Sequence, residues 1–93
     1  MNGKDKLLYL IENYKTGNYS TDDFCSLYTN AFNHETEASD FTGEELEHYK
    51  QFMQIASRYS PYDEDLIKYP GIYNDTETIN EALFKLCEYL HLE

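Results

Sequence analysis

The side chains in this chain that are best suited to metal binding are three histidines and two cysteines: His34, His48, His91, Cys25 and Cys87. The histidines fall in a connection, in a helical segment and at the chain end, at no spacing typical of zinc ligands. The cysteines are isolated and form no paired motif. The run 63–65 is acidic but lacks the alternating acids, central glycine and distal glutamate of a calcium loop. We therefore expect no metal site.

Catalytic chemistry is equally poorly supported. The glycines are dispersed, which excludes a phosphate-cradling loop of the usual kind. Pairs of carboxylates are capable of acid–base chemistry, but on so acidic a chain their proximity in sequence carries almost no information. We predict that the protein is not an enzyme, has no catalytic residues and uses no cofactor.

Aromatic and acidic residues gather instead in the segment Arg58-Tyr59-Ser60-Pro61-Tyr62-Asp63-Glu64-Asp65. Large aromatic rings supply buried contact area at protein interfaces, and unpaired carboxylates steer a basic partner. This chemistry suits binding to a cationic protein surface.

Length and charge limit the class of protein. The chain has 93 residues and a formal charge of -11, with 41% hydrophobic and 16% aromatic residues. This size predicts one domain, residues 1–93, and the apolar content predicts that it folds. The negative field repels phosphate backbones and anionic lipid, so we expect neither nucleic acid nor membrane as a partner. Without a signal peptide or a span of about 20 apolar residues, the expected location is cytoplasmic.

Hydrophobic periodicity predicts four helices. The first covers about residues 5–15, and the second follows a Ser20 cap, with Asp23 completing a capping-box-like pair. A polar connection, 33–41, leads to a Thr42–Glu45 capping box and a third helix that runs to Pro61. The fourth is capped by Asp75 or Thr76 and ends near residue 90. The apolar stripes of these helices carry most of the predicted core, including Leu27, Cys25, Cys87, Tyr9, Tyr14, Tyr28 and Tyr49.

These elements predict an all-α fold, an antiparallel four-helix bundle with a long irregular loop at 60–75 between helices 3 and 4. Residues 64–68 have the pattern for a short helical turn within that loop. Up-down topology places the loop beside the turn that joins the first two helices, and puts Glu35 and Glu37 at the opposite end. The closing pair Leu92-Glu93 resembles an expression-vector remnant and is given no functional weight.

Charge and tyrosine distribution indicate the binding surface. From residue 16 to residue 49 there is no lysine or arginine, whereas the same stretch holds eight acids. Tyr62, Tyr69 and Tyr73 occur in the irregular loop, where no apolar stripe requires them, and tyrosines in such a setting are typical interface anchors. We predict a partner-binding surface of Tyr59, Tyr62, Asp63, Glu64, Asp65 and Tyr69, with Glu44, Glu45 and Glu47 on the exposed side of helix 3 as secondary candidates. Tyr59 also has the spacing of a core residue.

In these features the chain resembles immunity proteins of the colicin D type, which are also found beside contact-dependent growth-inhibition toxins. The resemblance covers roughly residues 5–90: a short acidic helical chain, the Phe24–Tyr28 opening of helix 2, the 58–65 segment and the amphipathic helix from Asn80 to Leu90. It implies a four-helix bundle that acts as a ribonuclease inhibitor or antitoxin. Its implied partner is the C-terminal nuclease domain of a cognate toxin, commonly a tRNase, whose active site it covers with acids in place of RNA phosphates.

Two other functions compete with this interpretation. A DNA-mimic inhibitor would carry acids along an elongated face and bind many basic proteins. A helical adaptor would be acidic only for solubility, and its loop tyrosines would pack inward. A neighbouring gene that encodes a large secreted protein with a basic C-terminal domain would favour the immunity function over both.

Overall fold

The computed structural model describes residues 3–69 and 71–91, which adopt an all-α fold, as predicted. Within this described part of the chain there is no β-strand, only an isolated parallel bridge between Tyr59 and Asn74. Leu92, Glu93 and Pro70 lie outside it. The elements in chain order are α1 (Gly3–Lys15), α2 (Thr21–Glu35), a 3-10 turn η1 (Ala38–Asp40), α3 (Gly43–Ala56), α4 (Asp63–Lys68) and α5 (Thr76–Leu90).

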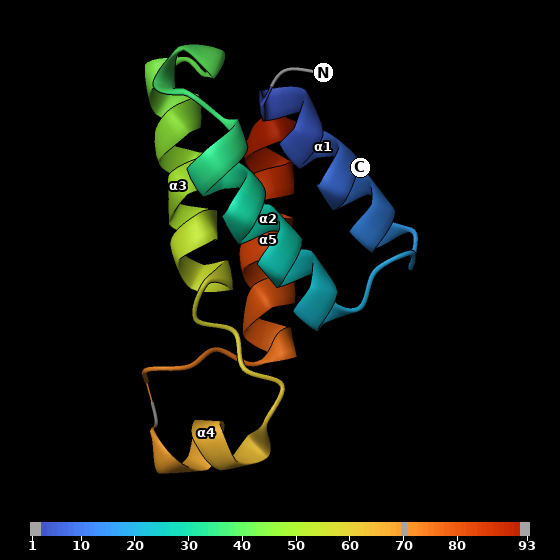
Figure 1. The fold of residues 1–93 in the computed structure, drawn as a ribbon, viewed down its shortest axis with the longest axis vertical. Helices are drawn as coiled ribbons and strands as arrows, with labels where there is room; N and C mark the ends of the chain where they lie inside the picture. Colours follow the sequence, from blue (N-terminus) through green and yellow to red (C-terminus); the bar gives the residue numbers. More distant parts are fainter. Residues whose placement is uncertain (1–2, 70, 92–93) are drawn as a thin grey trace.

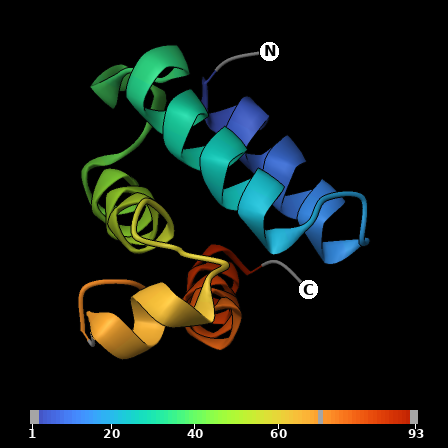
Figure 2. The same ribbon diagram turned by 60° about the horizontal axis from the view of Figure 1, so that its bottom comes forward.

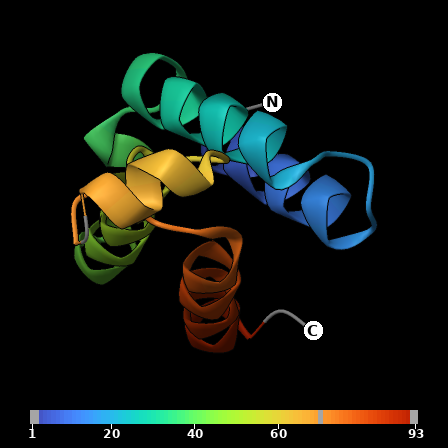
Figure 3. The same cartoon turned by 90° about the horizontal axis from the view of Figure 1, so that it is seen from below.

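The four longer helices pack in sequence order. α1 packs on α2, α2 on α3, and α3 on α5. Figures 1 and 2 show α1 and α2 side by side, and Figure 3 shows this pair inclined to α3 and α5. The short α4 projects beyond the ends of α3 and α5, so it adds little to the core.

The core is rich in aromatic rings. Phe24 of α2 lies against Tyr14 of α1 as a stacked pair, with ring centroids 4.4 Å apart, and against Phe52 of α3 at 6.0 Å. Tyr28 meets Phe52 edge-on at 4.9 Å. Such pairs add about 0.5–1.5 kcal/mol each beyond the area they bury. The aromatic core therefore joins the first three long helices.

The helix starts follow the predicted caps. Ser20 accepts a hydrogen bond from the Asp23 amide, and Asp75 accepts one from the Thr78 amide. Thr42 and Glu45 form the expected reciprocal capping box. At α2 only the Ser20 half of the expected pair is made. These side chains satisfy amides that a helix start leaves without partners, so sequence located the starts well.

The helix ends differ from expectation. α2 continues to Glu35, and η1 occupies part of the connection at 33–41. The expectation that helix 3 runs to Pro61 is wrong, because α3 ends at Ala56. The backbone beyond α3 turns to meet Asn74: the Asn74 amide donates to the Arg58 carbonyl over 2.8 Å, and the Ser60 amide donates to the Asn74 carbonyl over 3.0 Å. A tertiary contact thus ends the helix before proline does.

Two of the predicted core residues are exposed. Tyr9 and Leu27 lie on the outer sides of α1 and α2, with 48% and 40% of their surface accessible. The other core tyrosines are buried, or half-buried in the case of Tyr14, and both cysteines are buried and free, as expected. Periodicity shows which face is apolar, but not how far the neighbouring helix reaches around it.

Gly3 marks the close approach of α1 to the end of α2. A Cβ atom at this position would lie 2.6 Å from the Glu35 carbonyl oxygen and 2.6 Å from the Thr36 Cα. Only glycine fits there without movement of the backbone. This contact holds the first helix against the α2–η1 junction.

The two acidic ends of the molecule are separated as expected. Figure 1 shows η1, which follows Glu35 and Glu37, at the top of the long axis and α4 at the bottom. The turn at 16–20, however, lies to one side in Figures 1 and 3 rather than beside α4, because α1 and α2 are inclined. Among the described residues, no helix has the length and apolar character to cross a membrane.

Candidate protein-binding arm

The segment 60–75 leaves the end of α3, forms α4 and returns to α5, and we call it the arm. Its base is fixed by the two backbone hydrogen bonds between residues 58–60 and Asn74. The Asn74 side chain adds a third, since its Nδ2 donates to the Ile55 carbonyl over 2.9 Å. A loop whose ends are tied in this way loses less entropy when a partner binds it.

A serine organises the start of α4. Ser60 is 95% buried, and its Oγ donates to Asp65 Oδ2 over 2.8 Å and accepts the Tyr62 amide over 3.2 Å. Tyr62 is the N-cap residue but makes no side-chain cap bond, so the buried serine fixes the backbone here instead. Asp63, Glu64 and Asp65 occupy the first turn, where negative charge stabilises a helix.

The arm presents a large apolar surface to solvent. Among the described residues, eight large hydrophobic side chains are exposed, and five of them belong to the arm: Tyr62 (67%), Ile67 (80%), Ile72 (53%), Tyr69 and Tyr73. The last two rings form an edge-on pair with centroids 6.1 Å apart. These side chains lie outside the core, and exposed apolar side chains that gather together are a common feature of interaction sites.

Free carboxylates lie beside this apolar surface. Asp63 and Glu64 are exposed and form no ion pair within the described chain. Lys68 is the one base among the described arm residues, and its amino group lies 5.6 Å from the centroid of the Tyr69 ring. The arm therefore combines exposed rings with unneutralised negative charge.

Five of the predicted primary residues lie in the arm: Tyr62, Asp63, Glu64, Asp65 and Tyr69. Asp65 is half-buried and bound to Ser60, so it orders the arm rather than facing outward. The sixth, Tyr59, packs against the core, and its hydroxyl lies 3.2 Å from Thr76 Oγ1. The position of Tyr59 therefore matches the alternative prediction, that of a core residue.

The secondary candidates on α3 divide in the same way. Glu44 and Glu47 are exposed, as expected. Glu45 is not: it accepts a 2.6 Å hydrogen bond from Lys4 and caps α3. The bond from Lys4, followed by the bond from the Thr42 amide, lowers the pKa of Glu45. The carboxylate of Glu45 is therefore paired within the fold and is less available to a partner.

Sequence reasoning left out two exposed arm residues, Ile67 and Ile72, and did not place Tyr73 in the site. The available signal was the same as for Tyr69: a large apolar residue in a polar segment with no helical stripe around it. A short helix has too few residues to show an apolar stripe, so the sequence did not indicate whether Ile67 faces the core or solvent.

The described histidines, cysteines and acids form no metal-binding cluster. Within residues 3–69 and 71–91, no three histidine, cysteine or acidic side chains gather to hold a metal ion. Burial raises the pKa of Cys25 to about 12 and that of Cys87 above its usual value, which keeps both thiols protonated and unreactive.

Comparison with known proteins finds no similar protein family, no similar curated protein and no similar solved structure. A proposal of function therefore rests on the residue pattern of the sequence and on the geometry of the arm.

Proposed function

We propose that this chain is an immunity-type protein that binds the basic C-terminal nuclease domain of a cognate bacterial toxin through the arm and blocks its active site. The observation that carries the proposal is the exposure of Tyr62 and Ile67 next to the free carboxylates of Asp63 and Glu64. The resemblance to colicin D type immunity proteins supplies the kind of toxin, a ribonuclease that is commonly specific for tRNA. In this proposal the protein has no catalytic role and acts in the cytoplasm.

We also propose that the four longer helices form an antiparallel four-helix bundle, which would suit this function. The packing order α1, α2, α3, α5 and the short connections between the first three favour that description. The bundle then serves as a rigid base for the arm. Its role is to hold the contact residues in place before the partner arrives.

The two chemical components of the arm have different roles in binding. Burying an exposed tyrosine or isoleucine contributes about 1.5–3 kcal/mol, and anchors of this kind dominate the slow dissociation of protein complexes. Carboxylates attract a basic cleft over about a Debye length, roughly 10 Å at 0.1 M salt, and mainly raise the association rate. We expect Asp63 and Glu64 to occupy positions that RNA phosphates take in the toxin.

The proposal predicts that a gene next to that of this chain encodes the toxin domain, and the test co-expresses that domain with the chain in a growth-rescue assay. The chain should restore growth, and its complex with the purified domain should associate more slowly as salt rises. Asp63→Asn with Glu64→Gln should reduce the association rate about tenfold and flatten its salt dependence. Tyr62→Ala with Ile67→Ser should speed dissociation 100-fold or more.

A matched control neutralises two exposed acids away from the arm, Glu12→Gln with Glu35→Gln. It changes the net charge by the same amount, so it should leave most of the association rate intact. If the wild-type chain gives no protection, the toxin assignment is wrong. If the control slows association as much as the arm variant, the whole field acts rather than this site, as a DNA mimic would require.

A further inference from the structure

A second exposed surface lies on α5, outside the arm. Its centre is Phe84, which is 66% exposed. Of the eight exposed large hydrophobic side chains among the described residues, three lie outside the arm, and Phe84 is the most exposed of them. The buried stripe of α5 consists of Ile79, Leu83, Leu86 and Cys87 and does not include it. Core packing therefore does not require a phenylalanine at this position.

Carboxylates surround the Phe84 ring. Glu81 comes three residues before Phe84 and Glu88 four residues after it, so both lie on the same side of the helix as the ring. Glu77, two turns before the ring, is aligned with them. The three glutamates and Phe84 line one open hollow of about 770 Å³ on the outer side of α5, and we call this surface the Phe84 face. All three glutamates are exposed, and none forms an ion pair within the described chain.

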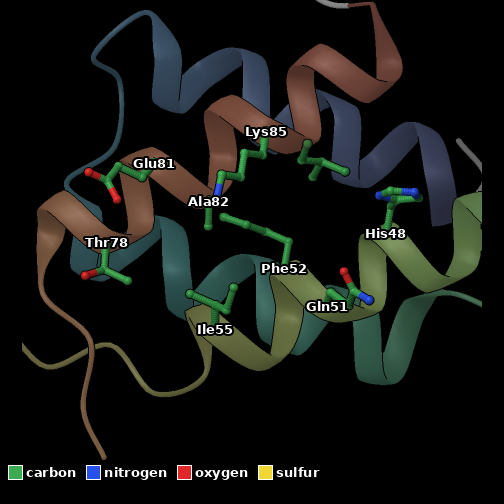
Figure 4. Close-up of a pocket in the computed structure, with 9 residues that line it drawn as sticks. His48, Gln51, Phe52, Ile55, Thr78, Glu81, Ala82 and Lys85 are labelled. Atoms are coloured by element: carbon green, nitrogen blue, oxygen red, sulfur yellow. The ribbon is translucent and has the colours of Figure 1, made fainter. Parts of the chain in front are cut away.

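One base, Lys85, also borders the Phe84 face, so three carboxylates stand against one ammonium group. Figure 4 shows the side of α5 that meets α3. There the Lys85 side chain extends over the hollow between the two helices, whereas the Glu81 carboxylate points away from Phe52. Lys85 is thus directed toward α3, and the surroundings of the Phe84 ring keep an excess of negative charge.

The Phe84 face is held in place by the fold and lies close to the arm. The Tyr14 hydroxyl of α1 donates to Oδ1 of Asn80, which lines the same hollow one turn before the ring, over 2.6 Å. The arm joins α5 at Thr76, eight residues before Phe84, which is about 12 Å along the helix. An interface of ordinary size buries about 800 Å² on each partner, which is enough to include both surfaces.

An exposed aromatic ring between free carboxylates has the chemistry that recognises an arginine side chain. The planar guanidinium group stacks on an aromatic ring and donates paired hydrogen bonds to carboxylates, whereas the lysine ammonium is more strongly hydrated and lacks this fork. We infer that the Phe84 face binds an arginine side chain of the same basic partner that the arm contacts. This inference rests on the proposed function and extends its interface from the arm to α5.

Substitution of the ring separates stacking on a cation from simple apolar contact. The measurement is binding of each variant to the purified toxin domain that the proposed function predicts. Phe84→Leu keeps an apolar side chain but removes the aromatic face, and it should weaken binding about fivefold. Tyr9→Leu removes another exposed ring, on α1, and is the matched control that should bind like the wild type. Wild-type affinity in Phe84→Leu would overturn the inference.

Substitution of the acids tests the second half of the recognition. Glu81→Gln with Glu88→Gln should weaken binding about tenfold, and the loss should shrink as the salt concentration rises. Glu35→Gln with Glu37→Gln removes the same charge from exposed positions beside η1 and should change affinity less than twofold. Equal losses in the two pairs would show that only the overall charge matters and would overturn the inference.

A double-mutant cycle identifies the arginine itself. When the arginines of the toxin domain are replaced by lysine one at a time, one of them should lose its effect on binding in the Phe84→Leu background. If no arginine is coupled to Phe84, the inference is overturned. Circular dichroism should show wild-type helicity in every variant, because all of the substituted side chains are exposed.

The outcome for the arm variants separates this inference from the proposed function. If the Phe84 and glutamate variants bind like the wild type while the arm variants lose binding, the inference is overturned and the proposed function stands. If the arm variants also bind like the wild type, both are wrong. A wild-type dimer that Phe84→Leu disrupts, with toxin affinity unchanged, would identify a second copy of the chain as the occupant and overturn the inference.

Discussion

Two buried tyrosines of the core differ in whether their hydroxyl groups are hydrogen-bonded, and this difference can be tested by mutation. Tyr28 and Tyr49 are both fully buried. The Tyr28 hydroxyl donates to the Tyr49 carbonyl over 3.2 Å, whereas the Tyr49 hydroxyl has no hydrogen-bond partner among the described residues. Replacing each with phenylalanine removes one oxygen atom and keeps the ring. The two substitutions should therefore change stability in opposite directions.

The magnitudes follow from the environment of each hydroxyl. An unsatisfied buried polar group costs about 1–3 kcal/mol, so Tyr49→Phe should raise the free energy of unfolding by about 1–2 kcal/mol. Tyr28→Phe loses a hydrogen bond whose net contribution is about 0.5–1.5 kcal/mol and should lower it by that amount. The two variants should thus differ by about 1.5–3.5 kcal/mol, which corresponds to about 6–28 °C in Tm for a domain of this size.

Urea denaturation followed by circular dichroism at 222 nm measures both changes, provided that the m-values of the variants match that of the wild type. Each variant serves as the control for the other, because both remove one phenolic oxygen from the same core. A fall of 1 kcal/mol or more for Tyr49→Phe would show that its hydroxyl is bonded in the folded protein. The reasoning from an unsatisfied group would then be wrong.

Three further outcomes follow from the same structure. Burial, with the nearby Glu45 charge, raises the pKa of Tyr49 to about 12. Because the unfolded phenol ionises near pH 10, this group lowers the free energy of unfolding by roughly 1.4 kcal/mol per pH unit between pH 10 and 12, in addition to the contribution of Tyr28, and Tyr49→Phe should reduce the slope by that amount. The Lys4 bond lowers the pKa of Glu45, so the ionised carboxylate stabilises the folded protein at pH values above the unfolded pKa of the group. This stabilisation should be lost as the pH falls through the lowered folded pKa. In an acid titration, the free energy of unfolding of Glu45→Gln should therefore fall less steeply than that of the wild type. Gly3→Ala should cost about 1–3 kcal/mol in urea denaturation because its Cβ meets backbone 2.6 Å away, whereas Gly43→Ala, with nothing within 4 Å, should be neutral or stabilising; equal effects would contradict the close approach at α1.

Much of the helical framework is predictable from local chemistry. Ser20, Thr42 and Asp75 mark helix starts because each can bond an amide only two or three residues away. Apolar spacing located the buried faces of α2, α3 and α5 for the same reason. The end of α3 was not predictable in this way, since Asn74 contacts residues more than a dozen positions earlier in the chain.

The candidate site was predicted in part. Tyr62 and Tyr69 were recognised because they stand outside any helical stripe, and both are exposed. Asp65 and Glu45 were taken as free acids, but each is bound within the fold, by Ser60 and Lys4 respectively. Sequence shows that a carboxylate is present, whereas its availability depends on which side chain the fold brings to it.

The amino-acid sequence alone determined the helical class of this protein, its helix starts, its negative charge and the clustering of rings and acids at 58–65, because all of these depend on residue types and short spacings. The tertiary structure decided which of those groups face solvent. It tied the base of the arm through Asn74, removed Asp65 and Glu45 from the exposed surface and left Phe84 on the outer side of α5. These features require contacts between distant segments, whose geometry depends on how whole helices pack rather than on any local pattern.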